Sequence, residues 1–254
     1  YAAAAVLEGI DLAIPGGSIT ALIGPNACGK STLLRGLSRL LAPRHGTILL
    51  DGHDINRLPT RQVAQRVAML PQQGEAPDGL TVRELAAFGR HPHRGWLAAA
   101  NAQDEQIVAQ ALASVGLTDL GDHLVDQLSG GQRQRAWLAM ALAQQAGILL
   151  LDEPTTFLDP AHQWEILGLI RELNRIRDCT VVMVLHDLTL AARFADRIVV
   201  IDQHRVAASG KPAEVLTAER IAAIYRMRAD VSIDPEGIPL IVLRGLCGAE
   251  GPHA

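Results

Sequence analysis

Near the start of the chain lies a glycine-bearing loop, Gly24-Pro25-Asn26-Ala27-Cys28-Gly29-Lys30-Ser31, with Thr32 next. It fits the pattern G-x-x-x-x-G-K-[ST], whose glycines let backbone N–H groups turn inward around phosphate oxygens at a helix N-terminus. An apolar strand precedes the loop, and a helix with leucines on one face comes after it. Lys30 would reach the β- and γ-phosphates of a nucleotide, and the Ser31 hydroxyl would ligate Mg²⁺. We therefore expect residues 24–32 to bind nucleotide phosphates.

The lysine of this loop stands out against the rest of the composition. The chain has 23 Lys and Arg residues, and only Lys30 and Lys211 are lysines. Lysine supplies a compact ammonium, whereas arginine supplies a planar guanidinium. Lys30 is a lysine in an arginine-rich chain, at the position where a phosphate site needs a point charge. This supports the interpretation of residues 24–32 as a phosphate-binding loop.

A second feature is an apolar strand, 148–151, that ends at Asp152-Glu153. A carboxylate at the tip of such a strand can hold Mg²⁺. Because successive side chains of a strand point in different directions, the two acids should not share one task. We assign Asp152 to the metal and Glu153 to the attacking water as general base. Two solvated charges at a strand end would explain the pair equally well if the phosphate loop were not present.

A third feature is the run Leu128-Ser129-Gly130-Gly131-Gln132. Ser129 and Gln132 have the spacing of a capping box, so a helix is expected to begin here. The free N–H groups of that helix end, together with the Ser129 hydroxyl, would form a seat for an anion. A plain helix cap is the alternative. It leaves unexplained a second anion seat about 100 residues after the first.

Strands and helices alternate on both sides of a helical middle. Strands are expected at 19–23, 47–50, 66–70, 148–152, 180–185 and 197–202. Helices are expected late in the chain, at 160–176, 188–194 and 218–225. The alternation of Ile10, Leu12 and Ile14 predicts an additional strand before the first of these strands. From about Thr81 to Gln145 the pattern is helical and rich in alanine. The alternation predicts a mainly parallel sheet covered by helices. Residues 1–74 and 146–254 are expected to form an α/β core, and 75–145 an inserted helical subdomain.

The three motifs in this order, with His186 directly after a later strand, resemble ABC-type ATPase domains over nearly the whole chain. The resemblance implies a P-loop NTPase (RecA-like) α/β fold with an antiparallel N-terminal β part and an ATP and Mg²⁺ site. It also implies site roles: Gln72 contacts Mg²⁺ and water and senses the membrane partner, Asp159 lies in the D-loop, His186 contacts the γ-phosphate, and Tyr1 stacks on adenine.

The resemblance and the spacing of the motifs together suggest a dimer. The seat at Ser129 lies on the helical insertion, too far along the fold to reach the nucleotide held by the same chain's P-loop. Two chains arranged head to tail would sandwich two ATP molecules, each between one P-loop and the Ser129-Gly130-Gly131 of the other copy. Closure would then depend on ATP and opening on hydrolysis.

Composition limits the other classes of function. The net charge is −4, which gives no basic footprint for nucleic acid. No apolar run approaches the roughly 20 residues of a membrane span, no signal peptide is legible, and the three cysteines show no disulfide or metal pattern. His91-Pro92-His93 is interpreted as a solvated loop rather than a metal site, because no cysteine or acid stands at ligand spacing.

Secondary motifs narrow the resemblance to the ATPase subunits of iron-siderophore importers, with haem and vitamin B12 importers as close relatives. They are Leu70-Pro71-Gln72, 81–85, 152–159, 185–188 and Asp234-Pro235-Glu236-Gly237-Ile238-Pro239-Leu240. The resemblance implies transmembrane permease subunits as direct partners, an extracytoplasmic substrate-binding protein as an indirect one, and a peripheral place on the cytoplasmic face of the inner membrane. A soluble ABC ATPase and a P-loop kinase of a small metabolite remain as alternatives; the kinase does not explain Ser129 to Gln132.

Overall fold

The computed structural model describes residues 6–72, 74, 76–94, 101–156 and 158–247. Its centre is a six-stranded sheet with the strand order β4-β5-β6-β1-β7-β8. The strands are β1 (Ile19–Ile23), β4 (Val67–Leu70), β5 (Ile148–Leu151), β6 (Thr180–Val184), β7 (Arg197–Asp202) and β8 (Arg205–Gly210). The first five run parallel, and only β8 pairs antiparallel, with β7. The expected mainly parallel sheet is confirmed.

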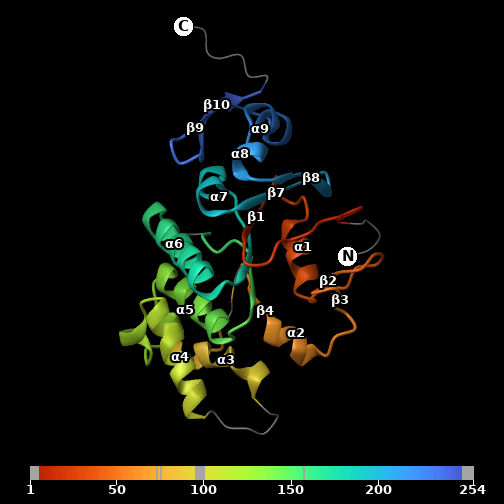
Figure 1. The fold of residues 1–254 in the computed structure, drawn as a ribbon. Coiled ribbons are helices and arrows are strands. Elements are labelled where there is room, and N and C mark those ends of the chain that lie inside the picture. The colour runs from red at the N-terminus through yellow and green to blue at the C-terminus, as the bar shows by residue number, and fades with distance from the viewer. Residues whose placement is uncertain (1–5, 73, 75, 95–100, 157, 248–254) are drawn as a thin grey trace.

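Helices cover both faces of this sheet (Figure 1). One face packs on α1 (Lys30–Leu37) and α2 (Thr60–Arg66), and the other on α5 (Gly130–Ala143), α6 (Pro160–Arg177) and α7 (Leu188–Phe194). Side chains along each strand alternate between two apolar clusters: Val181 and Met183 belong to one, Val182 and Val184 to the other. Burial on both faces explains why these strands are continuous apolar runs.

The antiparallel part near the N-terminus is smaller than expected. It consists of β2 (Leu49–Leu50) and β3 (His53–Asp54), which pair with each other. The strand predicted from Ile10, Leu12 and Ile14 is wrong, because residues 10–14 form no strand ladder. These side chains instead pack, partly buried, against the apolar cluster under α1. The alternation reflects burial on one side without a neighbouring strand to pair with.

The middle of the chain is helical, as predicted. It comprises α3 (Val82–Phe88), η1 (His91–His93), α4 (Ala102–Ser114), η2 (Thr118–Leu120), η3 (Val125–Gln127) and α5. Thr81 begins α3 with a capping box: its hydroxyl accepts from the Glu84 N–H while the Glu84 carboxylate accepts from the Thr81 N–H. None of the helices that the structure describes is long and apolar enough to cross a membrane.

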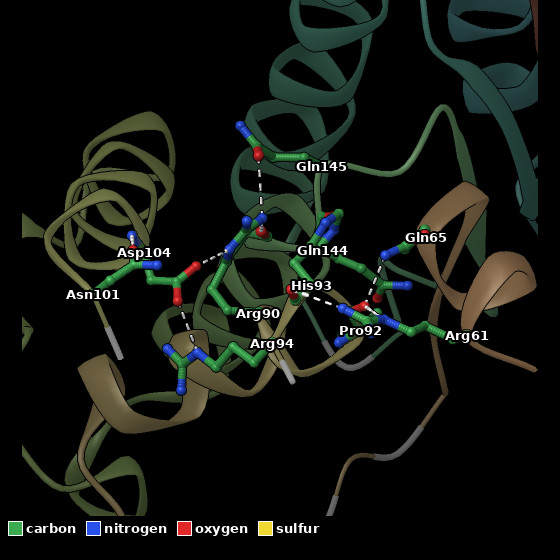
Figure 2. A network of polar contacts seen from close by, with 11 residues as sticks. Arg61, Gln65, Arg90, Pro92, His93, Arg94, Asn101, Asp104, Gln144 and Gln145 are labelled. Carbon is green, nitrogen blue, oxygen red and sulfur yellow. Dashed lines mark hydrogen bonds and ion pairs between the residues drawn. The ribbon is translucent and has the colours of Figure 1, made fainter. Parts of the chain in front are cut away.

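A polar network joins the helices of this region to one another, and its outer contacts reach α2 of the core (Figure 2). Asp104 accepts from Arg90 Nε at 2.8 Å and from Arg94 Nε at 2.9 Å. Arg90 also donates to the carbonyl of Ala143 at the end of α5. Arg61 of α2 donates to the carbonyls of Pro92 and His93. His91-Pro92-His93 is therefore not a plain solvated loop but a short 3₁₀ turn, η1, held against the core.

The last part of the chain contains two short helices and a separate two-stranded sheet. The helices are α8 (Pro212–Val215) and α9 (Ala218–Tyr225), and the antiparallel strands are β9 (Met227–Ile233) and β10 (Pro239–Leu246). The bounds of α7, β7 and α9 agree with prediction to the residue. The strand β9 was not predicted from the sequence, although Arg228, Asp230 and Ser232 alternate with apolar residues there, which is the pattern of a strand covered on one face.

Candidate nucleotide site

The loop between β1 and α1 has the shape that its glycines allow. Gly24 has φ +143°, and a Cβ there would overlap the carbonyl oxygen of Ile201 at the end of β7. Gly29, with φ +107°, directly precedes α1. Ala27 also adopts a left-handed φ of +61°, which costs a residue with a Cβ. Pro25 is half-buried and Asn26 and Ala27 are exposed, so the loop opens to solvent at the carboxyl edge of the sheet.

Lys30 is buried inside this loop. Its side-chain Nζ donates to the carbonyls of Gly24 at 2.9 Å and Pro25 at 2.7 Å, and it lies 3.8 Å from the Sγ of Cys28, which is itself buried. Both oxygen partners are neutral carbonyls. A phosphate anion is a stronger partner for an ammonium, so the group is positioned to exchange loop carbonyls for a phosphate.

Ser31 joins the loop to the end of β5. Its hydroxyl donates to Asp152 Oδ1 at 2.9 Å, across 121 residues of sequence. Asp152 is 2% exposed, and this burial raises the pKa of its carboxyl, which the Ser31 hydrogen bond only partly offsets. Thr32, the next residue of α1, is half-buried. Two oxygen donors at this spacing suit a hard divalent cation such as Mg²⁺.

Glu153 lies beside Asp152 but faces a different set of groups. Its Oε1 is 2.7 Å from His186 Nε2, and its Oε2 accepts from Gln72 Nε2 at 2.6 Å and from Thr156 Oγ1 at 2.9 Å. Burial alone would raise the pKa of this carboxyl, but the hydrogen bonds from His186, Thr156 and Gln72 together lower it. The two acids thus have separate surroundings, as predicted, but the reason differs: β5 ends at Leu151, and the left-handed φ of +53° at Glu153 turns its side chain away from that of Asp152.

An open depression of about 580 Å³ lies at this edge of the sheet. Its walls are Arg35, Leu40, Met69, Pro71, Gln72 and Asp152. Gln72 and Asp152 come after neighbouring strands, β4 and β5, whose carboxyl ends meet here. The structure therefore brings Lys30, Ser31, Gln72, Asp152, Glu153 and His186 together at one end of the sheet, where parallel α/β folds bind ligands.

The remaining predicted residues lie at two neighbouring helix starts. Ser129 caps α5 in a full capping box with Gln132, whose side chain is used in that box. Asp159 caps α6 and also accepts from the ring of His162, and these hydrogen bonds lower the pKa of its carboxyl. Gly131 faces His162 and Leu158. Ser129 and Gly130 are exposed, so the seat is open to a partner. Tyr1 falls outside the described residues.

The structure adds two residues that the motifs missed. Thr156 donates to Glu153, and a threonine three residues after an acid in a tight turn is a signal that could have found it. Tyr225, the last residue of α9, is half-buried beside the P-loop; this burial raises the pKa of its phenol, while a hydrogen bond with the Gly24 backbone opposes the shift. Nothing in the sequence links it to a loop about 200 residues earlier.

Comparison with known proteins assigns this chain to a family. Residues 7–156 match the family described as ABC transporter. YusV of Bacillus subtilis (strain 168), named "Probable siderophore transport system ATP-binding protein", is 50% identical over 246 residues, 96% of this chain and 90% of that protein. The ferric enterobactin transport ATP-binding protein FepC of Escherichia coli (strain K12) is 47% identical over 96% of this chain and 91% of its own length.

A solved structure agrees with this assignment. The dimeric ATP-binding cassette MJ0796, in a post-hydrolysis state bound to ADP and Pi, matches with a TM-score of 0.72 and 30% identity over 82% of this chain and 90% of that one. The fold is the one that the resemblance to ABC-type ATPase domains implies, and the phosphate loop and the paired acids follow one another in the implied order. This chain is an ATP-binding member of the ABC transporter family.

Proposed function

We propose that this chain is the ATP-hydrolysing subunit of an importer for an iron(III)-siderophore complex, working as a head-to-tail dimer that sandwiches two ATP molecules. The observation that carries the proposal is the Ser31–Asp152 contact, which joins the phosphate loop to the acidic pair at one edge of the sheet. The names of the relatives supply the cargo class, because a site that binds only nucleotide carries no information about cargo.

The phosphate side of the site would be formed by the P-loop, residues 24–32. Lys30 would leave the carbonyls of Gly24 and Pro25 for the β- and γ-phosphates. Ser31, Asp152 and Gln72 offer oxygen ligands that fit Mg²⁺. When bound, Mg²⁺ would neutralise charge on the phosphate oxygens.

Hydrolysis would use the neighbouring acid. Glu153 would accept a proton from the attacking water as general base, and His186 would donate to the γ-phosphate. His186 is 44% exposed on its side chain and bonded to Glu153, so it can turn toward a phosphate without breaking any packing. Gln72, exposed at the start of its loop, would respond to the membrane subunit and to the bound water.

The second half of each site would come from the other copy. The exposed Ser129 and Gly130, with Gly131, would meet the γ-phosphate held by the opposite P-loop, and Gln132 would keep that helix start in place. Asp159 lies beside this seat, and Tyr1 would stack on adenine. Residues 75–145 would act as the subdomain that carries the seat, and 1–74 with 146–254 as the ATP-binding core.

Transport would follow from closure and opening of this dimer. The chain would bind transmembrane permease subunits at the cytoplasmic face of the membrane, with Gln72 and the helical region transmitting the motion. An extracytoplasmic substrate-binding protein would deliver the chelate to the permease and touch this chain only indirectly. Nucleic acid is not an expected partner, because the net charge is −4.

Two measurements test the proposal. The purified chain should hydrolyse Mg-ATP without any added acceptor, which separates it from a metabolite kinase. Cells that carry the native chain should take up radiolabelled ferric siderophore, and cells that carry Glu153→Gln should not, while labelled vitamin B12 and haem uptake stay equal in both. Loss of B12 or haem uptake instead would reassign the cargo. Intact uptake of all three would place the ATPase on another transporter or off the membrane.

A further inference from the structure

Three donors hold the carboxylate of Glu153, and they come from different parts of the chain. Gln72 comes after β4 and His186 after β6, so both reach Glu153 from neighbouring strands. Thr156 belongs to the same turn as Glu153. Gln72 and Thr156 share Oε2, and His186 has Oε1. One donor is therefore local to the carboxylate, and two are distant.

The turn keeps Thr156 next to Glu153. Glu153 adopts a left-handed φ of +53°, which re-aims its side chain after Asp152. The Thr156 N–H donates to the Glu153 carbonyl at 3.2 Å, and the Thr156 hydroxyl donates to the Glu153 side chain at 2.9 Å. Thr155, between them, is buried. Such a backbone conformation persists only where its surroundings fix it, and here the turn holds the Thr156 hydroxyl beside the Glu153 carboxylate.

The two distant donors have other work in turnover. Under the proposed function, Gln72 turns to Mg²⁺ and water, and His186 turns to the γ-phosphate. Both would then leave the carboxylate. Oε1 would lose its partner and become free to accept the proton of the attacking water, while Oε2 would keep the Thr156 hydroxyl. A carboxylate that had no donor left could rotate about its last bond and lose its alignment.

We propose that Thr156 is a positioning residue for hydrolysis: its hydroxyl holds Oε2 of Glu153, so that Oε1 faces the attacking water after Gln72 and His186 have changed partners. The inference rests on the proposed function, since it needs Glu153 as the general base. Thr156 acts through Glu153 alone and needs no contact with the nucleotide or the attacking water.

The test is a double-mutant cycle on Mg-ATP hydrolysis by the purified full chain. Thr156→Val keeps the shape and removes the hydroxyl; we expect kcat to fall roughly tenfold to 100-fold while KM for ATP stays within about twofold. Thr156→Ser should restore kcat to within about threefold of the native chain, because it keeps the donor. Adding Thr156→Val to Glu153→Gln should lower kcat no further, because the residue has nothing left to position.

Thr20→Val is the matched control. The Thr20 hydroxyl is buried in β1 and has no hydrogen-bond partner among the described residues, so the same exchange there should leave kcat and KM unchanged. If Thr156→Val fails to fold, as judged by circular dichroism, Thr156→Ala takes its place in the cycle. Native kcat in the hydroxyl-free variant, no rescue by serine, or a further loss in the double variant would overturn the inference. Native kcat in Glu153→Gln would instead overturn the proposed function.

Discussion

The carboxylates of Asp104 and Glu153 each have partners at both oxygens, but the two are bound by different kinds of group. Asp104 accepts from Arg90 and Arg94, and its side chain is 5% exposed. Glu153 accepts from Gln72, Thr156 and His186, and its side chain is 12% exposed. The partners of Asp104 are permanent cations. Those of Glu153 are an amide, a hydroxyl and a histidine ring.

The difference separates a structural acid from one that can react. A carboxylate between two guanidiniums is neutralised, and removal of either side leaves a buried charge without a partner. A carboxylate held by neutral donors keeps its own charge and can change partners at little cost. The Asp104 junction in Figure 2 is thus suited to fixing the helices of the middle region against one another, and the Glu153 cluster to proton transfer. Three measurements test whether these two acids differ in this way, and a fourth concerns the phosphate loop.

The largest expected effect is on turnover at Glu153. Glu153→Gln keeps the size and shape of the side chain but replaces one acceptor oxygen by an N–H donor and removes the base, so kcat should fall by about 10²–10⁴-fold, with ATP still bound. The variant should form a stable dimer at saturating Mg-ATP, measured by size-exclusion chromatography. Glu105→Gln, an exposed acid beside Asp104, is the matched control and should keep native kcat. A variant that turned over normally, or stayed monomeric with ATP, would contradict the assignment of Glu153.

The next effect is on stability at Asp104. Asp104→Asn leaves the Arg90 and Arg94 guanidiniums without a counter-ion, so the free energy of unfolding should fall by about 3–5 kcal/mol. Urea unfolding followed by circular dichroism measures it. Asp122→Asn is the matched control, because its ion pair with Arg83 is exposed and should contribute less than about 1 kcal/mol. Equal losses in the two variants would remove the contrast between the junction and the surface.

A smaller effect should appear on acidification. The hydrogen bond from Arg90 lowers the pKa of the Asp104 carboxyl, against the opposing effect of burial. A carboxyl whose pKa is lower in the folded state than in the unfolded state stabilises the fold above the unfolded value of about 3.9, and loses that contribution as the pH falls through the folded value. Unfolding free energies measured from pH 7 downward should therefore drop less steeply below about pH 4 in Asp104→Asn. Parallel curves for the native chain and the variant would show that another group dominates the loss of stability at low pH.

The smallest effect is expected in the phosphate loop. Ala27 has φ +61°, so Ala27→Gly relieves a steric cost of about 1–2 kcal/mol and adds a comparable entropic one. We expect the free energy of unfolding to change by less than about 1 kcal/mol, with kcat kept. Ala27→Val, which brings a branched side chain to the same φ, should lower both stability and ATP affinity. If valine were tolerated as well as glycine, the left-handed conformation would not persist in solution.

Much of the fold was predictable because the signals are local. Capping boxes at Thr81 and Ser129 specify helix starts through hydrogen bonds within four residues. The apolar runs of β5 and β6 report burial on both faces of a parallel sheet. The phosphate loop could be recognised from the spacing of its glycines, because only certain backbone conformations can surround a phosphate. The failed strand at 10–14 shows the limit: alternation reports which side is buried and not whether a strand lies alongside.

The sequence alone therefore determined the class of the molecule: an α/β chain with a phosphate loop, a strand-end pair of acids and a second anion seat on a helical insertion. Only the tertiary structure decided which acid meets which donor. The Asp104 pairing with Arg90, the Tyr225 contact with the P-loop and the two distant donors on Glu153, Gln72 and His186, join residues from separate elements. Local hydrogen bonds and periodicity act between neighbours in sequence, whereas these contacts depend on strand order and helix packing, which appear only once the chain has folded.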